Sequence, residues 1–209
     1  MTAPHSRVIT KTLLACGVIG APLFVFVFLV EGATRPRYNA LRQPVSDLAI
    51  GEFGLIQTAN FIITGLLFLA FAVGLRRRLL PLGAVWGSLF VGLFAVGLIG
   101  AGIFPGDRHP LLHGLCGIPV FFGLPIACFV FSRLFVRLGK YGWATYSCLT
   151  GVIMLAMFIL AAMGFGGRPG LVNHAGVFQR LSITVGWTWV TLLAIYSLRS
   201  PYDADDARL

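Results

Sequence analysis

The sequence predicts an all-α integral membrane protein, a polytopic bundle of six transmembrane helices with the N and C termini in the cytoplasm. The first observation is composition: 57% of the 209 residues are hydrophobic and 11% are charged, with a mean hydropathy of +0.88. A soluble domain carries about a quarter charged residues, so that class is excluded. The second observation is that the sequence contains six long apolar stretches. Each has the length of about 20 residues that a helix needs to cross a bilayer.

The six predicted spans follow one another with short connections. They cover residues 12–30, 55–75, 82–104, 112–132, 143–165 and 177–198. The first is longer than the apolar region of a signal peptide, about 7 to 15 residues, so we interpret it as a retained helix. The longest connection, residues 31–54, is too short for a soluble domain. We therefore expect residues 1–209 to form one six-span membrane domain.

Lysine and arginine in the connections set the expected orientation, because cytoplasmic loops carry the excess of both. An N-terminus in the cytoplasm places ten of the 16 on the inner side and six on the outer side. The most compact inner group is Arg76, Arg77 and Arg78, and Arg208 is another of the ten inner residues. The net charge of +9 is then mainly an orientation signal. We expect a multi-pass protein of the plasma (inner) membrane, with membrane lipids and not nucleic acid as its partners.

Proline and glycine distinguish the spans from one another. Pro22 in the first span, and Pro119 with Pro125 in the fourth, predict bends, because proline removes a backbone donor and clashes with the preceding turn. The third span carries small residues four apart, which let helices approach closely in lipid: Gly83 with Gly87, and Gly97 with Ala101. We expect these glycine-rich faces to pack within the bundle, or alternatively against other membrane helices.

The first outer connection is rich in polar residues. It contains Arg35, Arg37 and Tyr38, and residues 44–50 look like a short interfacial helix. Ser46 is the expected N-cap of that helix, and Asp47 suits its positive end. Capping alone explains Ser46 and Asp47 as well as a role in a site does.

Polar residues also mark the outer ends of the second and sixth spans. Gln57, Asn60 and Thr64 recur at i, i+3 and i+7, so they share one helix face that should turn away from lipid. They would either bond neighbouring helices or line a polar cavity. Gln179 and Arg180 open the sixth span, and Arg180 is the one residue among all Asp, Glu, Lys and Arg that falls inside the predicted spans. It would reach the headgroups or pair with a loop acid.

The second outer connection holds the residue types best suited to chemistry. If the fourth helix begins at Pro110, a favoured first position, His109 caps it and His113 lies one turn inside. His113 and Asp107 are the candidate catalytic residues, with His113 suited to proton transfer near neutral pH. Asp107, His109, His113 and His174 are ligand types for a transition metal, although their spacing matches no established signature. The sequence assigns no cofactor.

Several of these residues form a recognisable series. The series is Tyr38, Pro44-x-Ser46-Asp47-Leu48, Gly54-x-x-Gln57-x-x-Asn60-Phe61 with Gly65, Gly102-x-Phe104-Pro105-x-Asp107, and His113. It resembles a prokaryotic membrane family catalogued as domain of unknown function 998, from the first span to the sixth. The resemblance implies a multi-span membrane protein with polar motifs on its outer face. It implies no shared activity, so no catalytic assignment follows from it.

Three classes of function remain open. The first is a site on the outer face that binds an anionic lipid headgroup or small anionic ligand, since guanidinium groups suit phosphate and carboxylate oxygens. The candidate ligand-binding residues are Arg35, Arg37, Tyr38, Ser46, Asp47, Gln57, Asn60, Gln179 and Arg180. The second is uncoupled transport of a small lipophilic solute. The third is a non-catalytic assembly partner, and a metal-dependent membrane enzyme is a further alternative.

Overall fold

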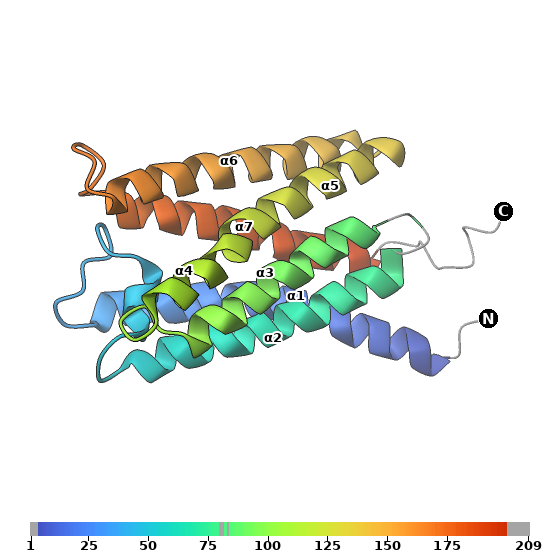
Figure 1. The fold of residues 1–209 in the computed structure, drawn as a ribbon. Helices are drawn as coiled ribbons and strands as arrows, with labels where there is room; N and C mark the ends of the chain where they lie inside the picture. Colours follow the sequence, from blue (N-terminus) through green and yellow to red (C-terminus); the bar gives the residue numbers. More distant parts are fainter. Residues whose placement is uncertain (1–3, 80–81, 83, 200–209) are drawn as a thin grey trace.

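The computed structural model describes residues 4–79, 82 and 84–199, and those residues form helices and short connections without a strand (Figure 1). Six helical segments of this part of the chain are long and apolar enough to cross a membrane, which confirms the predicted all-α, six-span class. The elements in order are α1 (Pro4–Thr34), η1 (Val45–Ala49), α2 (Gly54–Leu79), α3 (Val85–Ile103), α4 (Pro110–Ile118), η3 (Pro119–Gly123), α5 (Leu124–Arg137), α6 (Tyr141–Phe165) and α7 (Ala175–Arg199). The segments α4, η3 and α5 form one span.

Most helices extend beyond their predicted spans, and the extension of α1 changes the interpretation of the first connection. Helix α1 continues to Thr34, so Glu31 belongs to a helix and not to the first connection. Arg180 is therefore not the one charged residue within the longer helical spans, because α1 also contains Lys11 and Glu31 and arginines close α2, α5 and α7. A hydropathy window ends at a charged residue even where the backbone continues as a helix. Gly83 and Arg208, used in the sequence-based expectations, lie outside the described residues.

The helices form a closed ring in which each span packs on its neighbours in sequence and α7 returns to α1. Helix α1 begins and α7 ends at one end of the bundle, here called the terminal end (Figure 1). The opposite end, here called the loop end, carries η1 and the connections between α1 and α2, α3 and α4, and α6 and α7. All the candidate site residues lie toward the loop end or in its connections.

An aromatic cluster fills the middle of the ring. Trp187 of α7 is 2% exposed, and its ring centroid lies 4.1 Å from Phe24 of α1, 5.1 Å from Phe68 of α2 and 5.7 Å from Phe94 of α3. In lipid, helix association depends on such packing because the acyl chains are as apolar as the side chains. Trp187 therefore joins helices that are distant in sequence.

The fourth span changes helix type at Pro119, in the region where the sequence predicts a bend. Residues Pro119–Gly123 form a π-helical turn between α4 and α5, as expected where proline cannot donate to the preceding turn. By contrast, α1 is assigned as one helix across Pro22. Gly97 faces the turn so closely that a Cβ would lie 2.6 Å from Pro119 Cγ. Gly87 packs in the same way on Phe131, at 2.6 Å, so these small residues serve contacts inside the bundle.

Candidate functional site

Arg180 fixes the first connection to the start of α7. Its Nη1 donates hydrogen bonds to the carbonyl oxygens of Ala40 (2.7 Å), Gln43 (3.0 Å) and Gly176 (3.0 Å), and its Nη2 donates to the hydroxyl of Tyr38. The connection lies so close to α7 that a Cβ on Gly176 would lie 2.7 Å from the Gln43 oxygen. Arg180 thus bonds to backbone carbonyls and a phenol, and not to the loop acid that was one expectation.

Tyr38 and Gln179 complete this attachment. The Tyr38 hydroxyl donates to the carbonyl of Pro44 (2.9 Å), and its ring lies 5.6 Å from the Arg180 guanidinium carbon. Burial raises the pKa of Tyr38, although the adjacent Arg180 cation and its hydrogen bond act in the opposite direction, so the phenol stays neutral and keeps its donor. Gln179 Oε1 accepts from the backbone N–H of Val45 (2.8 Å). The structure thereby brings Tyr38, Gln179 and Arg180 together, residues far apart in sequence.

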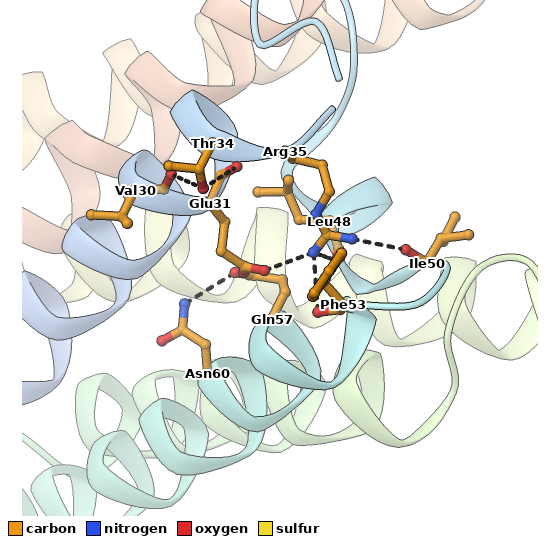
Figure 2. Close-up of polar contacts among 9 residues, drawn as sticks. All are labelled: Val30, Glu31, Thr34, Arg35, Leu48, Ile50, Phe53, Gln57 and Asn60. Carbon is orange, nitrogen blue, oxygen red and sulfur yellow. Dashed lines mark hydrogen bonds and ion pairs between the residues drawn. The ribbon is translucent and has the colours of Figure 1, made fainter. Parts of the chain in front are cut away.

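Arg35 holds the other side of the same connection (Figure 2). Its Nη2 donates to Glu31 Oε1 (2.7 Å) and to the carbonyls of Leu48 (2.9 Å) and Phe53 (3.1 Å), while Nη1 donates to Ile50 (3.2 Å). Glu31 is 6% exposed. Sequence reasoning missed this pair, although the i, i+4 spacing of an acid and an arginine on a helix was a usable signal.

A directional chain of hydrogen bonds runs along α2 beside this pair. The Thr64 hydroxyl donates to Asn60 Oδ1 (3.4 Å), and Asn60 Nδ2 donates to Gln57 Oε1 (3.2 Å) and to the Phe24 carbonyl (3.3 Å). The stripe is buried, as its helical spacing predicts. This series of hydrogen bonds ends at Gln57 and does not continue to Glu31, since Gln57 Nε2 and Glu31 Oε2 are both buried without a partner. Figure 2 shows the two side chains directed into the same space between α1 and α2.

A cavity of about 50 Å³ lies at the loop end, next to η1. Its wall is mostly apolar and aromatic, with three polar residues that come from three different elements: Ser46 of η1, His113 of α4 and Gln179 of α7. The apolar lining includes Phe24, Phe61, Leu98, Ala101, Phe121 and Trp187. The combination of an apolar wall with a few convergent polar groups is typical of small-molecule sites.

Three polar atoms of the lining residues have no hydrogen-bond partner among the described residues: Ser46 Oγ, His113 Nε2 and Gln179 Nε2. His113 Nδ1 lies 2.9 Å from the Phe104 carbonyl, and since a carbonyl only accepts, Nδ1 carries the hydrogen and Nε2 carries the lone pair. Gln179 uses Oε1 for Val45, which leaves the two hydrogens of Nε2 unused. The lining therefore offers an acceptor on His113, a donor group on Gln179 and a Ser46 hydroxyl that can do either.

Asp47 lies near this cavity within η1. Burial raises the pKa of Asp47 above its ordinary value, while a hydrogen bond with Gln43 and the nearby His113 act to lower it. Ser46 is not the N-cap, because Pro44 occupies that position without a side-chain hydrogen bond. The predicted capping role of Ser46 is wrong: the N-cap lies two residues earlier, and Ser46 instead lines the cavity.

Replacing Asp47 with asparagine is expected to raise the melting temperature at pH 7, with a difference that shrinks as the pH falls toward 4. A carboxyl with a raised pKa binds its proton more tightly in the folded state, so stability is lost as the pH rises through that folded-state pKa. Asparagine cannot ionise and avoids this loss. Thermal unfolding of both proteins in detergent between pH 4 and 7 tests it. A difference independent of pH would contradict the assignment.

The remaining candidates do not join this cavity. Asp107, His109 and His174 are exposed, and His109 stands at the N-cap position of α4 with its ring 5.8 Å from Phe104. Within residues 4–79, 82 and 84–199, no three histidine, cysteine, aspartate or glutamate side chains are grouped so that they could hold a metal ion. The four predicted metal ligands thus do not gather into one site, and His113 is the one of the four that lines the cavity.

Comparison with known proteins gives one match. No curated protein and no solved structure matches the chain. The sequence model of the family described as "Protein of unknown function (DUF998)" matches residues 18–196, which takes in α2 to α6, most of α1 and α7, and every candidate residue named above. The chain therefore belongs to the DUF998 family of proteins of unknown function.

Proposed function

We propose that the protein binds an uncharged amphiphile, such as a lipid with a free hydroxyl, in the loop-end cavity. The observation that carries the proposal is the pairing of an aromatic wall with unpartnered polar atoms, among them His113 Nε2 and Gln179 Nε2. A hydroxyl head group satisfies both atoms at once, because it accepts from the amide of Gln179 and donates to the imidazole of His113. The apolar part of the ligand packs on the rings beside them.

The distribution of charge favours a neutral head group over the anionic one that the sequence suggests. Arg35 and Arg180 direct their guanidinium hydrogens at Glu31, Tyr38 and backbone carbonyls. Neither guanidinium group therefore has a pair of free N–H donors for a ligand. Asp47 adds a carboxyl near His113. An anion entering the cavity would meet this carboxyl without a free cation. Arg37 and Arg42 are exposed and are better placed for the headgroups of surrounding lipid.

The size of the cavity restricts which part of the ligand it encloses. One water needs about 10–15 Å³ by the same kind of measure, so about 50 Å³ encloses a head group or a few methylene groups. A longer chain has to continue outside the cavity, into the bilayer. We accordingly propose single-chain lipids with small heads, of the monoacylglycerol or long-chain alcohol type, as the ligand class.

We further propose that the loop end faces outward from the plasma membrane, with the termini in the cytoplasm. Arg76, Arg77 and Arg78 close α2 at the terminal end, as the positive-inside rule favours for a cytoplasmic side. The cavity would then be open to lipid of the outer leaflet.

Two glycines of α4 provide a matched test. Gly117 lines the cavity, and a Cβ there would meet only Phe121, at 4.0 Å; a Cβ on Gly114 would meet nothing. Replacing either glycine with leucine raises the helix propensity by the same amount, about 0.5–1 kcal/mol, so this effect cancels in the comparison. Gly117→Leu is expected to weaken binding of radiolabelled 1-oleoylglycerol in detergent at least tenfold, whereas Gly114→Leu binds as the wild type does.

Equal binding by both variants and the wild type would overturn the cavity as the site. Lysophosphatidate with the same acyl chain serves as the anionic comparison. If it binds more tightly than 1-oleoylglycerol, and only the Gly117 variant loses it, the uncharged head group is wrong although the cavity is the site.

A further inference from the structure

A second recess lies at the opposite end of the bundle, between α3 and α5. It has a volume of about 230 Å³ and is lined by Ala84, Trp86, Phe90, Val130, Phe131, Arg133, Leu134 and Arg137. The residues come from the start of α3 and the end of α5, which places the recess at the terminal end. Most of its wall is apolar, and the two arginines are its charged residues.

The arginines present free guanidinium groups. Arg133 and Arg137 are one helical turn apart on α5, so their side chains share a face. Both are exposed, and neither has an ion pair or side-chain hydrogen bond among the residues that the structure describes. This separates them from Arg35 and Arg180, which are bonded within the protein. Two adjacent guanidinium groups match the oxygens of one phosphate group, which they can bind in a forked geometry.

The rest of the recess suits the other half of a lipid. Phe90, Val130 and Leu134 form an apolar wall that continues from the arginines toward the middle of the span. Trp86 is 63% exposed, and tryptophan is enriched at the depth where headgroups meet acyl chains. A free phosphate ion would use the arginines and leave the apolar wall uncovered. An acyl chain attached to the phosphate covers it.

We infer that this recess binds an acidic phospholipid, with its phosphate on Arg133 and Arg137 and one acyl chain against Phe90 and Leu134. Basic pockets between transmembrane helices near the cytoplasmic surface are a recurring form of lipid recognition. The inference is independent of the loop-end cavity, since the two sites have no residue in common. The anionic ligand suggested by the outer arginines is thus better accommodated at the other end of the molecule.

Removal of the two charges tests the site against a control with the same net charge. Arg133→Gln/Arg137→Gln removes both guanidinium groups from the recess, while Arg76→Gln/Lys140→Gln removes two exposed charges that are outside its lining. Native mass spectrometry of the full chain in detergent measures the dissociation constant for dioleoylphosphatidylglycerol, with dioleoylphosphatidylcholine as the uncharged comparison. Circular dichroism checks that both variants are folded.

The recess variant is expected to bind phosphatidylglycerol at least tenfold more weakly, while the control variant stays within twofold of the wild type. Phosphatidylcholine binding should be weak in the wild type and unchanged in both variants. Equal losses in the two variants would show that surface charge alone attracts the lipid, and would overturn the site, as would no loss in either. Inorganic phosphate at 10 mM, about the strength of an ordinary buffer, should not displace the lipid; displacement would overturn the lipid as occupant.

Discussion

Replacement of Arg180 by methionine is expected to lower the melting temperature in detergent by about 10 °C, among the largest effects of any single change at the loop end. Methionine keeps much of the volume but none of the donors to Ala40, Gln43, Gly176 and Tyr38. Hydrogen bonds from a charged group contribute about 1.5–3 kcal/mol each, so loss of this half-buried set should cost about 3–4 kcal/mol in total. About 2–4 °C accompanies each kcal/mol in a chain of this size. Differential scanning fluorimetry measures it.

Arg168→Met is the matched control for Arg180→Met. Arg168 lies in the connection before α7 at the same end of the bundle and is exposed, so its loss should change stability by less than about 0.5 kcal/mol. Similar losses in the two variants would show that total charge at the loop end matters, and not the bonds that Arg180 makes to the first connection.

Arg35→Met is expected to destabilise the protein by a comparable amount, about 3–5 kcal/mol, for a different reason. It leaves the Glu31 carboxylate inside a membrane span with no cation beside it, and Glu31 Oε2 already lacks a partner. Thermal unfolding in detergent measures the loss. The loss of stability comes mainly from the unpaired, buried carboxylate of Glu31, so it should be smaller when that carboxylate is removed.

A second change distinguishes this explanation from simple loss of packing. Glu31→Gln removes the charge and should recover a large part of the stability when combined with Arg35→Met. In a double-mutant cycle, the two changes should therefore show a coupling energy of more than about 1 kcal/mol, above the error of additivity for independent sites. If the stability loss of the double variant equals the sum of the losses of the two single variants, the ion pair with Glu31 does not explain the effect of Arg35→Met.

The parts of the fold that could be predicted from the sequence are those fixed by local patterns. Each span is an apolar run that must satisfy its backbone within a helix, and the spacing of Gln57, Asn60 and Thr64 places all three on the buried face of one helix. Pro110 at the start of α4 positions His113 as expected. The end of α1 escaped prediction because Arg35 neutralises Glu31 and lets the helix continue to Thr34.

For the candidate site, the sequence indicated which types of residue are present but not which groups they contact. Arg180 was expected to reach headgroups or an acid, but backbone carbonyls more than 130 residues earlier in the chain satisfy it. Ser46 was expected to cap η1, but Pro44 begins the turn. The cavity is lined by residues from α1, η1, α2, α3, α4, η3 and α7. No single helix pattern encodes a space that depends on the packing of so many elements.

The attachments made by Arg35 and Arg180 restrict the route by which the proposed ligand would reach the cavity. They attach the first connection on both sides of η1, at Gln43 and at Ile50, so this covering segment cannot lift without breaking several bonds. The opposite wall differs, because α4 buries none of its residues and leads into the π-helical turn at Pro119. Segments with so little burial open at the lowest free energy. For the ligand proposed above, we therefore expect exchange sideways past α4 and not through the first connection.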